Sequence, residues 1–385
     1  MTLDLARIGG QVDGMGRRLL ATREARRVQL ARAHAWFANV SPDWRQLAEQ
    51  ARTSKTSAAA PREALDASHP LPPIPRSYAV LATDGSSIDP DRHGPAMYAV
   101  INVGRVRICY GDTPDALLES TPQLLSEPDE LYVEQAGRKV LLGERLLDVR
   151  RSVAEMQALG SLADSIAGQG IAQVALADGL LTVWRQDWAG ADASELTAQF
   201  GAALNHIADL RVPLAAYVSQ PHSHWVADLL RVASGCRGGT GLCAARCGQD
   251  TCALDGVVDI ELYGNLPPGN RSGLFEVVGR DADRYGPRNR SHFFYLTVGA
   301  EVVRVEVPAW VADDSQALTC IHAVLWDQTQ RGQGYPVALA RAHEQAVISG
   351  QDRQAFRQLV LEALARQGLP TGLSEKQSSK EVRAV

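Results

Sequence analysis

The sequence predicts a mixed α/β fold, in which one β-sheet is flanked by helices. Three short β-rich stretches come first, at about residues 78–83, 97–110 and 131–135. Helix and strand then alternate, because a long amphipathic helix at 140–167 is followed by an apolar strand at 171–177. A group of strands followed by helix–strand alternation is the order typical of a mixed sheet.

The rest of the chain extends this alternation. The further expected elements are a helix at 193–210, a strand at 212–219, a β-rich stretch at 293–310, and helices at 315–328, 336–348 and 352–367. Residues 3–52 also have helical character, and Ser41-Pro42 predicts the start of a second helix because proline suits the first helical position.

Composition divides the chain into three parts. Alanine, serine and proline are enriched at 53–76, which indicates a linker. The polar character of the end predicts disorder. The expected parts are an N-terminal helical segment with its linker (1–76), one folded domain (77–368) with an insertion at about 234–256, and a tail (369–385).

Charge and hydropathy exclude several classes of protein. The 385 residues are 45% hydrophobic and 22% charged, with a net charge of −5, which argues against a strongly basic nucleic-acid coat protein. The first twenty residues lack the apolar core of a secretory signal, and no stretch of about 18 apolar residues suggests a membrane helix. We therefore expect a cytoplasmic protein without disulfides, since six cysteines lie in a chain with no export signal.

Two aspartates occupy equivalent places in this pattern. Asp84 follows one apolar strand and Asp178 follows another, and each precedes a glycine. Carboxylates at the ends of neighbouring strands favour a hard divalent cation such as magnesium or manganese, because the cation relieves their repulsion. The alternative is that each Asp-Gly pair is an ordinary turn.

Other candidates are weaker when considered singly. The helix between the aspartates carries Glu144 and Glu155, which are three helical turns apart and share a face. Tyr335 lies beside a Gly-Pro turn and His343 lies on a helix. Any of these side chains could equally be a solvated or structural residue.

Taken together, the motifs resemble those of the NurA nucleases. The resemblance covers residues 78–350 in order. The similar segments are ATDGSS at 82–87, YAVINVG at 98–104, ADGLL at 177–181, NRSGLF at 270–275, GYP at 334–336 and AHEQAV at 342–347.

This resemblance implies a ribonuclease H-like fold and a two-metal-ion phosphodiesterase that uses manganese or magnesium. It implies cleavage of DNA, as a 5′-to-3′ exonuclease and single-strand endonuclease, in DNA end resection and repair. It also implies a HerA-type hexameric ATPase as partner, and a homodimer. The site residues carried over are Asp84, Glu155, Asp178, Tyr335 and His343, with Asp84, Glu155, Asp178 and His343 as ligands for divalent cations. Glu155 is preferred over Glu144 because Arg151 precedes it in the family's Arg-x-x-x-Glu pattern.

Four cysteines form a feature outside the family pattern. They lie in a glycine-rich stretch with Cys-x6-Cys-x3-Cys-x4-Cys spacing, at Cys236, Cys243, Cys247 and Cys252. Four thiolates in one loop can hold zinc or an iron–sulfur cluster. Unligated thiols remain the alternative, and disulfides are a minor one.

Arginines suggest where DNA would bind. A polar, Gly- and Pro-containing segment carries four of them, and a fifth belongs to the NRSGLF motif; together they are Arg271, Arg280, Arg284, Arg288 and Arg290. They could form a strip that contacts phosphates, or a solvated loop.

Other interpretations of the chain are a ribonuclease on the same fold, a non-catalytic adaptor of a DNA translocase, and a metal-based redox sensor that uses the cysteines.

Overall fold

The described residues of the chain fold into two compact units. The structure, a computed structural model, describes residues 5–54, 58–91, 94–135, 138–166, 168, 170–182, 191–233, 254–279 and 281–371. Unit 1 consists of residues 1–70, 220–282 and 293–304, and unit 2 consists of residues 71–219, 283–292 and 305–385.

Unit 2 is built on a mixed sheet whose strand order is β9-β8-β3-β4-β5. Three of these strands form an antiparallel meander, namely β3 (Tyr78–Ile88), β4 (Ala99–Tyr110) and β5 (Asp115–Leu125). The other two, β8 (Ala172–Asp178) and β9 (Leu214–Val218), run parallel to β3. This arrangement confirms the predicted mixed sheet.

The third strand of the meander differs from the prediction. The stretch expected to be that strand contains β6 (Tyr132–Gln135), which instead forms a separate two-stranded hairpin with β7 (Arg138–Leu141). The true third strand, β5, was missed because it is mostly exposed and contains Pro122. Proline and polar residues are tolerated there since β5 is an edge strand, and they weaken the strand signal in the sequence.

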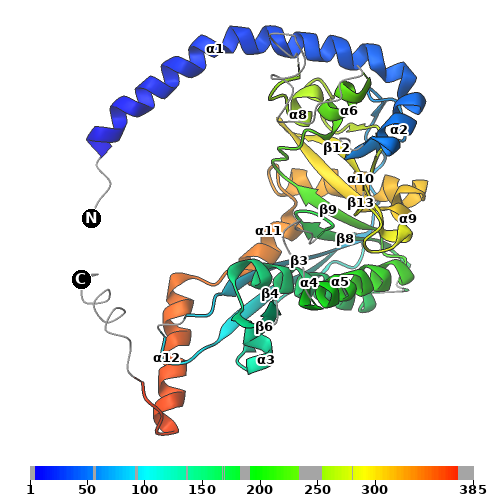
Figure 1. Ribbon diagram of the computed structural model, residues 1–385. Coiled ribbons are helices and arrows are strands. Elements are labelled where there is room, and N and C mark those ends of the chain that lie inside the picture. The colour runs from blue at the N-terminus through cyan, green and yellow to red at the C-terminus, as the bar shows by residue number, and fades with distance from the viewer. Residues whose placement is uncertain are drawn as a thin grey trace. The chain divides into compact units, whose positions relative to one another are not determined.

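Helices cover both faces of the unit 2 sheet (Figure 1). One face packs on α4 (Glu144–Asp164) and α5 (Ala191–Asp209), with a core that includes Leu81, Ile101 and Leu147. The other face packs on α10 (Ser315–Arg331) and α11 (Val337–Ala346). Alternate strand residues point to opposite faces, so odd-numbered residues of β3 contact α4 and even-numbered residues contact α10 and α11.

Unit 2 also has shorter elements and a helix near the end of the chain. These are α3 (Pro128–Leu131), the 3-10 turn η2 (Pro287–Asn289), α9 (Ala309–Ala312) and α12 (Gly350–Arg366). Throughout the part of the chain that the structure describes, no helix is both long enough and apolar enough to cross a membrane.

Unit 1 contains the N-terminal helices that the sequence predicts, together with several short strands that it did not predict. Its helices and 3-10 turn are α1 (Leu5–Val40), η1 (Ser41–Asp43), α2 (Trp44–Thr53), α6 (Trp225–Ala233) and α8 (Asp259–Leu262). Its short strands are β1 (Ala59–Pro61), β2 (Ser68–His69), β10 (Arg271–Ser272) and β11 (Phe275–Val277). Two longer strands, β12 (Ser291–Val298) and β13 (Glu301–Pro308), contribute residues to both units.

The stretch expected to be a linker takes part in this unit. β1 pairs with β11, and β2 pairs with β10, both antiparallel. Ala59, Ala60 and Leu65 are fully buried there. Small residues such as alanine are common in linkers. They also allow a strand and a helix to pack closely, as β1 and α2 do here.

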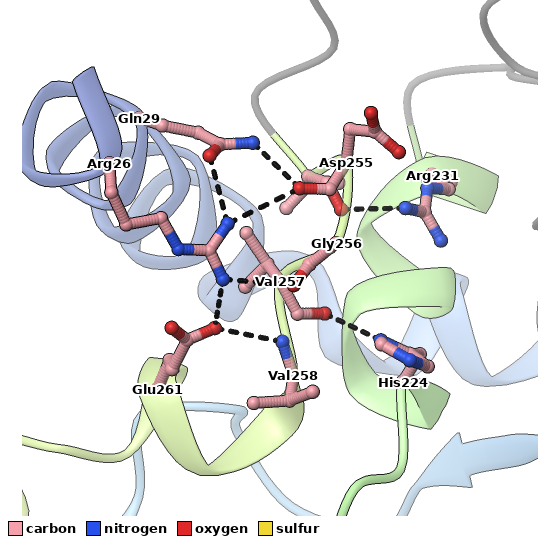
Figure 2. A network of polar contacts seen from close by, with 10 residues as sticks. Arg26, Gln29, His224, Arg231, Asp255, Gly256, Val257, Val258 and Glu261 are labelled. Atoms are coloured by element: carbon pink, nitrogen blue, oxygen red, sulfur yellow. Dashed lines mark hydrogen bonds and ion pairs between the residues drawn. The ribbon is translucent and has the colours of Figure 1, made fainter. Parts of the chain in front are cut away.

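A network of polar contacts fixes α1 to the segment that precedes α8 (Figure 2). The Arg26 guanidinium donates to the carbonyl oxygen of Gly256 at 2.8 Å and to Glu261 at 2.6 Å. From α6, Arg231 donates to the carbonyl oxygen of Leu254 at 2.6 Å. This last bond joins positions on either side of residues 234–253, so the two described ends of that stretch lie close together.

Candidate active site

The sheet of unit 2 brings Asp84 and Asp178 side by side. The parallel pairing of β3 with β8 runs from Tyr78↔Ala172 to Thr83↔Ala177 and stops there. Asp84 and Asp178 are the next residues of the two strands. Asp84 does not end its strand as expected, because β3 continues to Ile88 in pairing with β4. What ends at this point is the parallel pairing of β3 with β8, and both carboxylates follow its last residue pair directly.

Glu155 approaches this level from α4, through a gap that Gly85 leaves open. A Cβ atom at Gly85 would lie 2.3 Å from Glu155 Oε1 and 2.7 Å from Arg151 Cγ, so any side chain there would displace the glutamate. Thr83 donates from Oγ1 to the backbone carbonyl of Glu155 at 3.0 Å, which fixes this turn of α4 on β3. Glycine in the Asp-Gly motif is therefore required by a close approach.

The environment of Glu155 favours its protonated form. Burial, together with the negative charges of Asp84 and Asp178, raises the pKa of Glu155 to about 8, while Arg151 lowers it. Arg151 Nε lies 3.3 Å from Glu155 Oε1, and about a fifth of the glutamate side chain is exposed. These carboxylates are thus close enough to repel one another across low-dielectric surroundings.

Tyr335 holds Asp178. Its hydroxyl donates to Asp178 Oδ1 at 3.1 Å. Burial raises the pKa of the Tyr335 phenol well above its usual range, and the Asp178 charge adds to this, so the hydroxyl stays a donor. Tyr335 packs edge-on against Tyr217 of β9, with ring centroids 5.5 Å apart. Gly334, with a φ of 112°, makes the turn that directs Tyr335 towards the sheet.

Asp178 is the more open of the two aspartates to solvent, and it is also partly enclosed by protein. This enclosure raises its pKa, the hydrogen bond from Tyr335 lowers it, and the Asp84 charge raises it. Gly179 follows with a φ of 86°, a conformation that suits glycine, and its N–H donates to the carbonyl oxygen of Tyr217 at 2.9 Å. The second Asp-Gly motif is thus a real turn that also presents a carboxylate.

His343 holds Asp84 from α11. Its Nδ1 lies 2.7 Å from Asp84 Oδ2, and Asp84 Oδ1 accepts from the N–H of Gly85 at 2.8 Å. The histidine side chain is 68% exposed, whereas the Asp84 side chain is 17% exposed. An exposed imidazole held at one nitrogen leaves Nε2 accessible from solvent.

The donor set suits a hard divalent cation. Oxygen ligands from Asp84, Glu155 and Asp178 are what manganese and magnesium prefer, and a cation between them would relieve the repulsion that raises the pKa of Glu155. The side chains are arranged in pairs, Asp84 with His343 and Asp178 with Tyr335. Among the described residues, no three His, Cys, Asp or Glu side chains meet in a closed metal site. The arrangement is an open one, with its donors held in place by a tyrosine and a histidine.

Several predicted residues do not gather here. Glu144 is the first residue of α4 and is exposed, away from the Gly85 gap that Glu155 occupies. Cys236, Cys243, Cys247 and Cys252 lie outside the described residues, as does Arg280.

The predicted arginine strip is not a row of unpaired cations. Arg288 forms an ion pair with Asp209 at 2.6 Å, and Arg290 forms one with Asp283 at 2.7 Å. Arg284 lies exposed on the same segment and also has an interaction partner. Arg271 belongs to unit 1, where it is mostly buried and lies 3.6 Å from Glu63. The prediction considered only the arginines and not the acidic residues that could pair with them. One of these acids, Asp283, lies in the same segment of the sequence.

Sequence reasoning missed residues that support the site rather than form it. Gly85 and Arg151 shape the approach of Glu155, and Tyr217 supports Tyr335. Gly104 lets α11 pack directly on β4, because a Cβ atom there would lie 2.1 Å from the carbonyl oxygen of Ala342. Gly85 and Gly104 both lie inside the family-like motifs, and an unexplained glycine within a strand was the available signal.

Comparison with known proteins identifies the family of this chain. Solved structures similar to it include "Crystal structure of NurA" (10% identity, TM-score 0.43, covering 77% of this chain and 91% of that chain) and "Crystal structure of NurA with manganese" (10%, 0.40, 74% and 88%). A third is "Crystal structure of NurA bound to dAMP and manganese" (14%, 0.36, 77% and 89%). No curated protein matches the chain. The NurA domain pattern matches residues 78–348, a range that contains Asp84, Glu155, Asp178, Tyr335 and His343. The chain therefore belongs to the NurA family.

Proposed function

We propose that this protein is a metal-dependent DNA nuclease with a ribonuclease H-like fold, which hydrolyses phosphodiester bonds at the site formed by Asp84, Glu155 and Asp178. The observation that carries the proposal is that two carboxylates from neighbouring parallel strands lie beside a glutamate whose pKa they raise. Such mutual repulsion is costly unless a cation shares the carboxylates, so the site is built for an ion rather than for stability. Membership of the NurA family supports DNA as the substrate.

Each residue has a role in this proposal. Asp84, Glu155 and Asp178 would hold divalent cations, manganese or magnesium, and these would activate water and stabilise the leaving oxygen. Tyr335 orients the Asp178 carboxylate through its hydroxyl. His343 holds Asp84 at Nδ1, so its Nε2 is free to exchange a proton with the leaving group or to bind a cation.

The activity is proposed to be 5′-to-3′ exonucleolytic, with single-strand endonuclease action, in DNA end resection and repair together with a HerA-type hexameric ATPase. The test is degradation of end-labelled single- and double-stranded DNA in manganese, in magnesium and in EDTA, with and without the ATPase. We expect cleavage with manganese or magnesium and none with EDTA. Cleavage of RNA but not DNA would favour the ribonuclease alternative, and no cleavage under any condition would favour the adaptor.

A homodimer is also proposed, through the first part of α1. Its exposed apolar side chains repeat at alternating intervals of three and four residues, namely Leu5, Ile8, Val12, Met15 and Leu19. This is the spacing by which a helix packs on a second helix, and a second copy of the chain offers the matching face. The same part of α1 contains four glycines, each of which weakens an isolated helix by about 1 kcal/mol. Light scattering of the full chain and of Val12→Asp tests this, and a monomeric wild type contradicts it.

The cysteine cluster remains a prediction. Cys236, Cys243, Cys247 and Cys252 are proposed to hold zinc or an iron–sulfur cluster, on the basis of their spacing alone. Elemental analysis and the visible absorption spectrum of protein purified anaerobically without chelators test the proposal. Protein free of both metals would leave four ordinary thiols.

A further inference from the structure

The last turn of α11, the helix that carries His343, is tied to the sheet by side chains of two strands. Asn102 of β4 donates from Nδ2 to the carbonyl oxygens of Ala346 at 2.8 Å and Gln345 at 3.2 Å. Ser86 of β3 donates from Oγ to the same Ala346 oxygen at 2.5 Å. The last carbonyls of a helix have no partner within the helix, so these side chains supply the missing donors.

Sheet register places this tie beside the aspartate. Ser86 lies opposite Asn102, and Asp84 lies opposite Gly104. Residues two apart on a strand share a face, so all four point towards α11. Because Gly104 has no side chain, the backbone of α11 lies directly on β4. His343 is thereby held between two fixed points, the contact at Gly104 and the bonds from Asn102.

The buried Asn102 amide has one oxygen whose hydrogen-bonding capacity is unsatisfied among the described residues, which destabilises the fold. The residue is 9% exposed, and its Oδ1 is buried without a hydrogen-bond partner in the described structure. A buried acceptor left unpaired destabilises a protein, because it gives up its hydrogen bonds to water without replacing them. An apolar side chain would avoid that cost and would lose only the two bonds from Nδ2. What the amide contributes to the structure is those two bonds, and both end on α11, the helix that carries His343.

We propose that Asn102 is a positioning residue, which fixes the end of α11 so that His343 meets Asp84 in the geometry that the reaction requires. The inference rests on the proposed nuclease function, since it gives the position of His343 a catalytic purpose. Asn102 touches neither Asp84 nor His343 in this scheme, and it acts only through the helix.

The chain offers a matched control for the test. Asn289 is also buried, at 4% exposed, and its Oδ1 is likewise without a partner in the described structure. Its Nδ2 also donates twice, to Asn205 Oδ1 at 2.7 Å and to the carbonyl oxygen of Tyr285 at 3.2 Å. These residues belong to η2, α5 and the segment between β11 and η2, none of which carries a proposed catalytic residue.

The experiment compares Asn102→Asp with Asn289→Asp. Each change keeps the shape of the side chain and removes the donated hydrogens. With a short single-stranded DNA substrate we expect Asn102→Asp to lower kcat about tenfold to hundredfold with KM within about threefold, because misplacing a catalytic group acts on the reaction step. Asn289→Asp should leave kcat within about twofold while lowering Tm as much as Asn102→Asp does. Amide hydrogen exchange should speed up in α11 for Asn102→Asp only.

Unchanged kcat and unchanged exchange in α11 for a folded Asn102→Asp would overturn the proposal, as would an equal loss of kcat in both variants. If Asn102→Asp does not fold, Ser86→Ala removes one bond to the same carbonyl, and we expect faster exchange in α11 and a loss in kcat of about threefold. No effect on either would overturn the proposal. If wild-type protein cleaves no nucleic acid, the nuclease assignment fails, while exchange in α11 still decides whether Asn102 fixes the helix.

Discussion

The two units treat carboxylates in opposite ways. In unit 1, Asp259 is completely buried and accepts five hydrogen bonds, from the N–H groups of Trp225, Val226 and Ala227 and from the hydroxyls of Ser223 and Tyr295. In unit 2, Asp84 and Asp178 each accept far fewer bonds from the described residues, and their negative charges help to raise the pKa of the neighbouring Glu155.

The difference separates a structural carboxylate from functional ones. Asp259 accepts three of its hydrogen bonds from the N–H groups of the first turn of α6, so its carboxyl group caps the start of that helix. Within the part of unit 2 that the structure describes, Asp84 and Asp178 accept fewer hydrogen bonds than their oxygens could take. Groups that a fold holds close together without satisfying them are expected where a ligand completes the set.

The first prediction tests the functional side of this comparison. Asp84→Asn and Asp178→Asn should each lower DNA cleavage by about a thousandfold or more, equivalent to about 4 kcal/mol, because each removes a cation ligand. Thermal unfolding should be unchanged or slightly shifted upwards, since repulsion is relieved. Near-normal cleavage at saturating manganese by either variant would remove that aspartate from the site.

The second prediction tests the structural side. Asp259→Asn places an amide, with two donated hydrogens, opposite the donors that the carboxylate accepts from, so we expect a loss of about 3 kcal/mol in the free energy of unfolding. Chemical denaturation and hydrogen exchange in α6 measure it. At temperatures where the variant is folded, kcat on a short substrate should stay normal. A stable variant with lost activity would reverse the distinction between the two units.

The third prediction separates the two glutamates. Glu155→Gln should lower kcat about a hundredfold, because an amide is a poor ligand for a hard cation, whereas Glu144→Gln should change it less than about twofold. Both changes are isosteric and lie on the same helix, so Glu144→Gln is the matched control. The opposite ranking in a cleavage assay would move the site glutamate to the start of α4.

The fourth prediction concerns pH, in the absence of metal. The pKa of Glu155 is raised from 4.5 to about 8, so the folded state prefers the protonated form. Its contribution to stability is fully present below pH 4.5 and is lost as the pH rises through about 8. We expect the metal-free protein to lose roughly 1–3 kcal/mol over this range relative to Glu155→Gln, which cannot ionise. Denaturant titrations of both proteins with chelator, at about pH 5 and about pH 8.5, measure the difference, and parallel pH profiles would contradict it.

The fold class was predictable because the buried strands have strong apolar signals. β3, β4, β8 and β9 all lie where the sequence indicated strands, and α4, α5, α10 and α11 lie where it indicated helices. β5 was not predictable in the same way, since its residues face solvent at a sheet edge and carry no apolar alternation. Pairing partners in unit 1, such as β1 with β11, depend on contacts between distant parts of the chain, which no local pattern encodes.

The candidate site was predictable in its members but not in its arrangement. Asp84 and Asp178 stand out because each precedes a glycine after an apolar run, and the family motifs supplied Tyr335 and His343. The spacing in the sequence did not show that Asp84 and Asp178 lie side by side. Their placement follows from where the parallel pairing of β3 and β8 ends. Asn102 lies inside a family-like motif, but the sequence does not indicate its role. A polar residue in a strand can be interpreted only when its hydrogen-bond partner, here the end of α11, is known.

The bond from Arg231 to Leu254 has a consequence for how this chain can change over evolutionary time. That bond joins α6 to the segment before α8, so the described residues on either side of 234–253 lie close together in unit 1. Each doubling of the enclosed length then costs only about 0.6 kcal/mol of chain entropy. We therefore expect changes of chain length to be tolerated at this position, because the bonds of Arg26, His224 and Arg231 hold the surrounding described segments together (Figure 2).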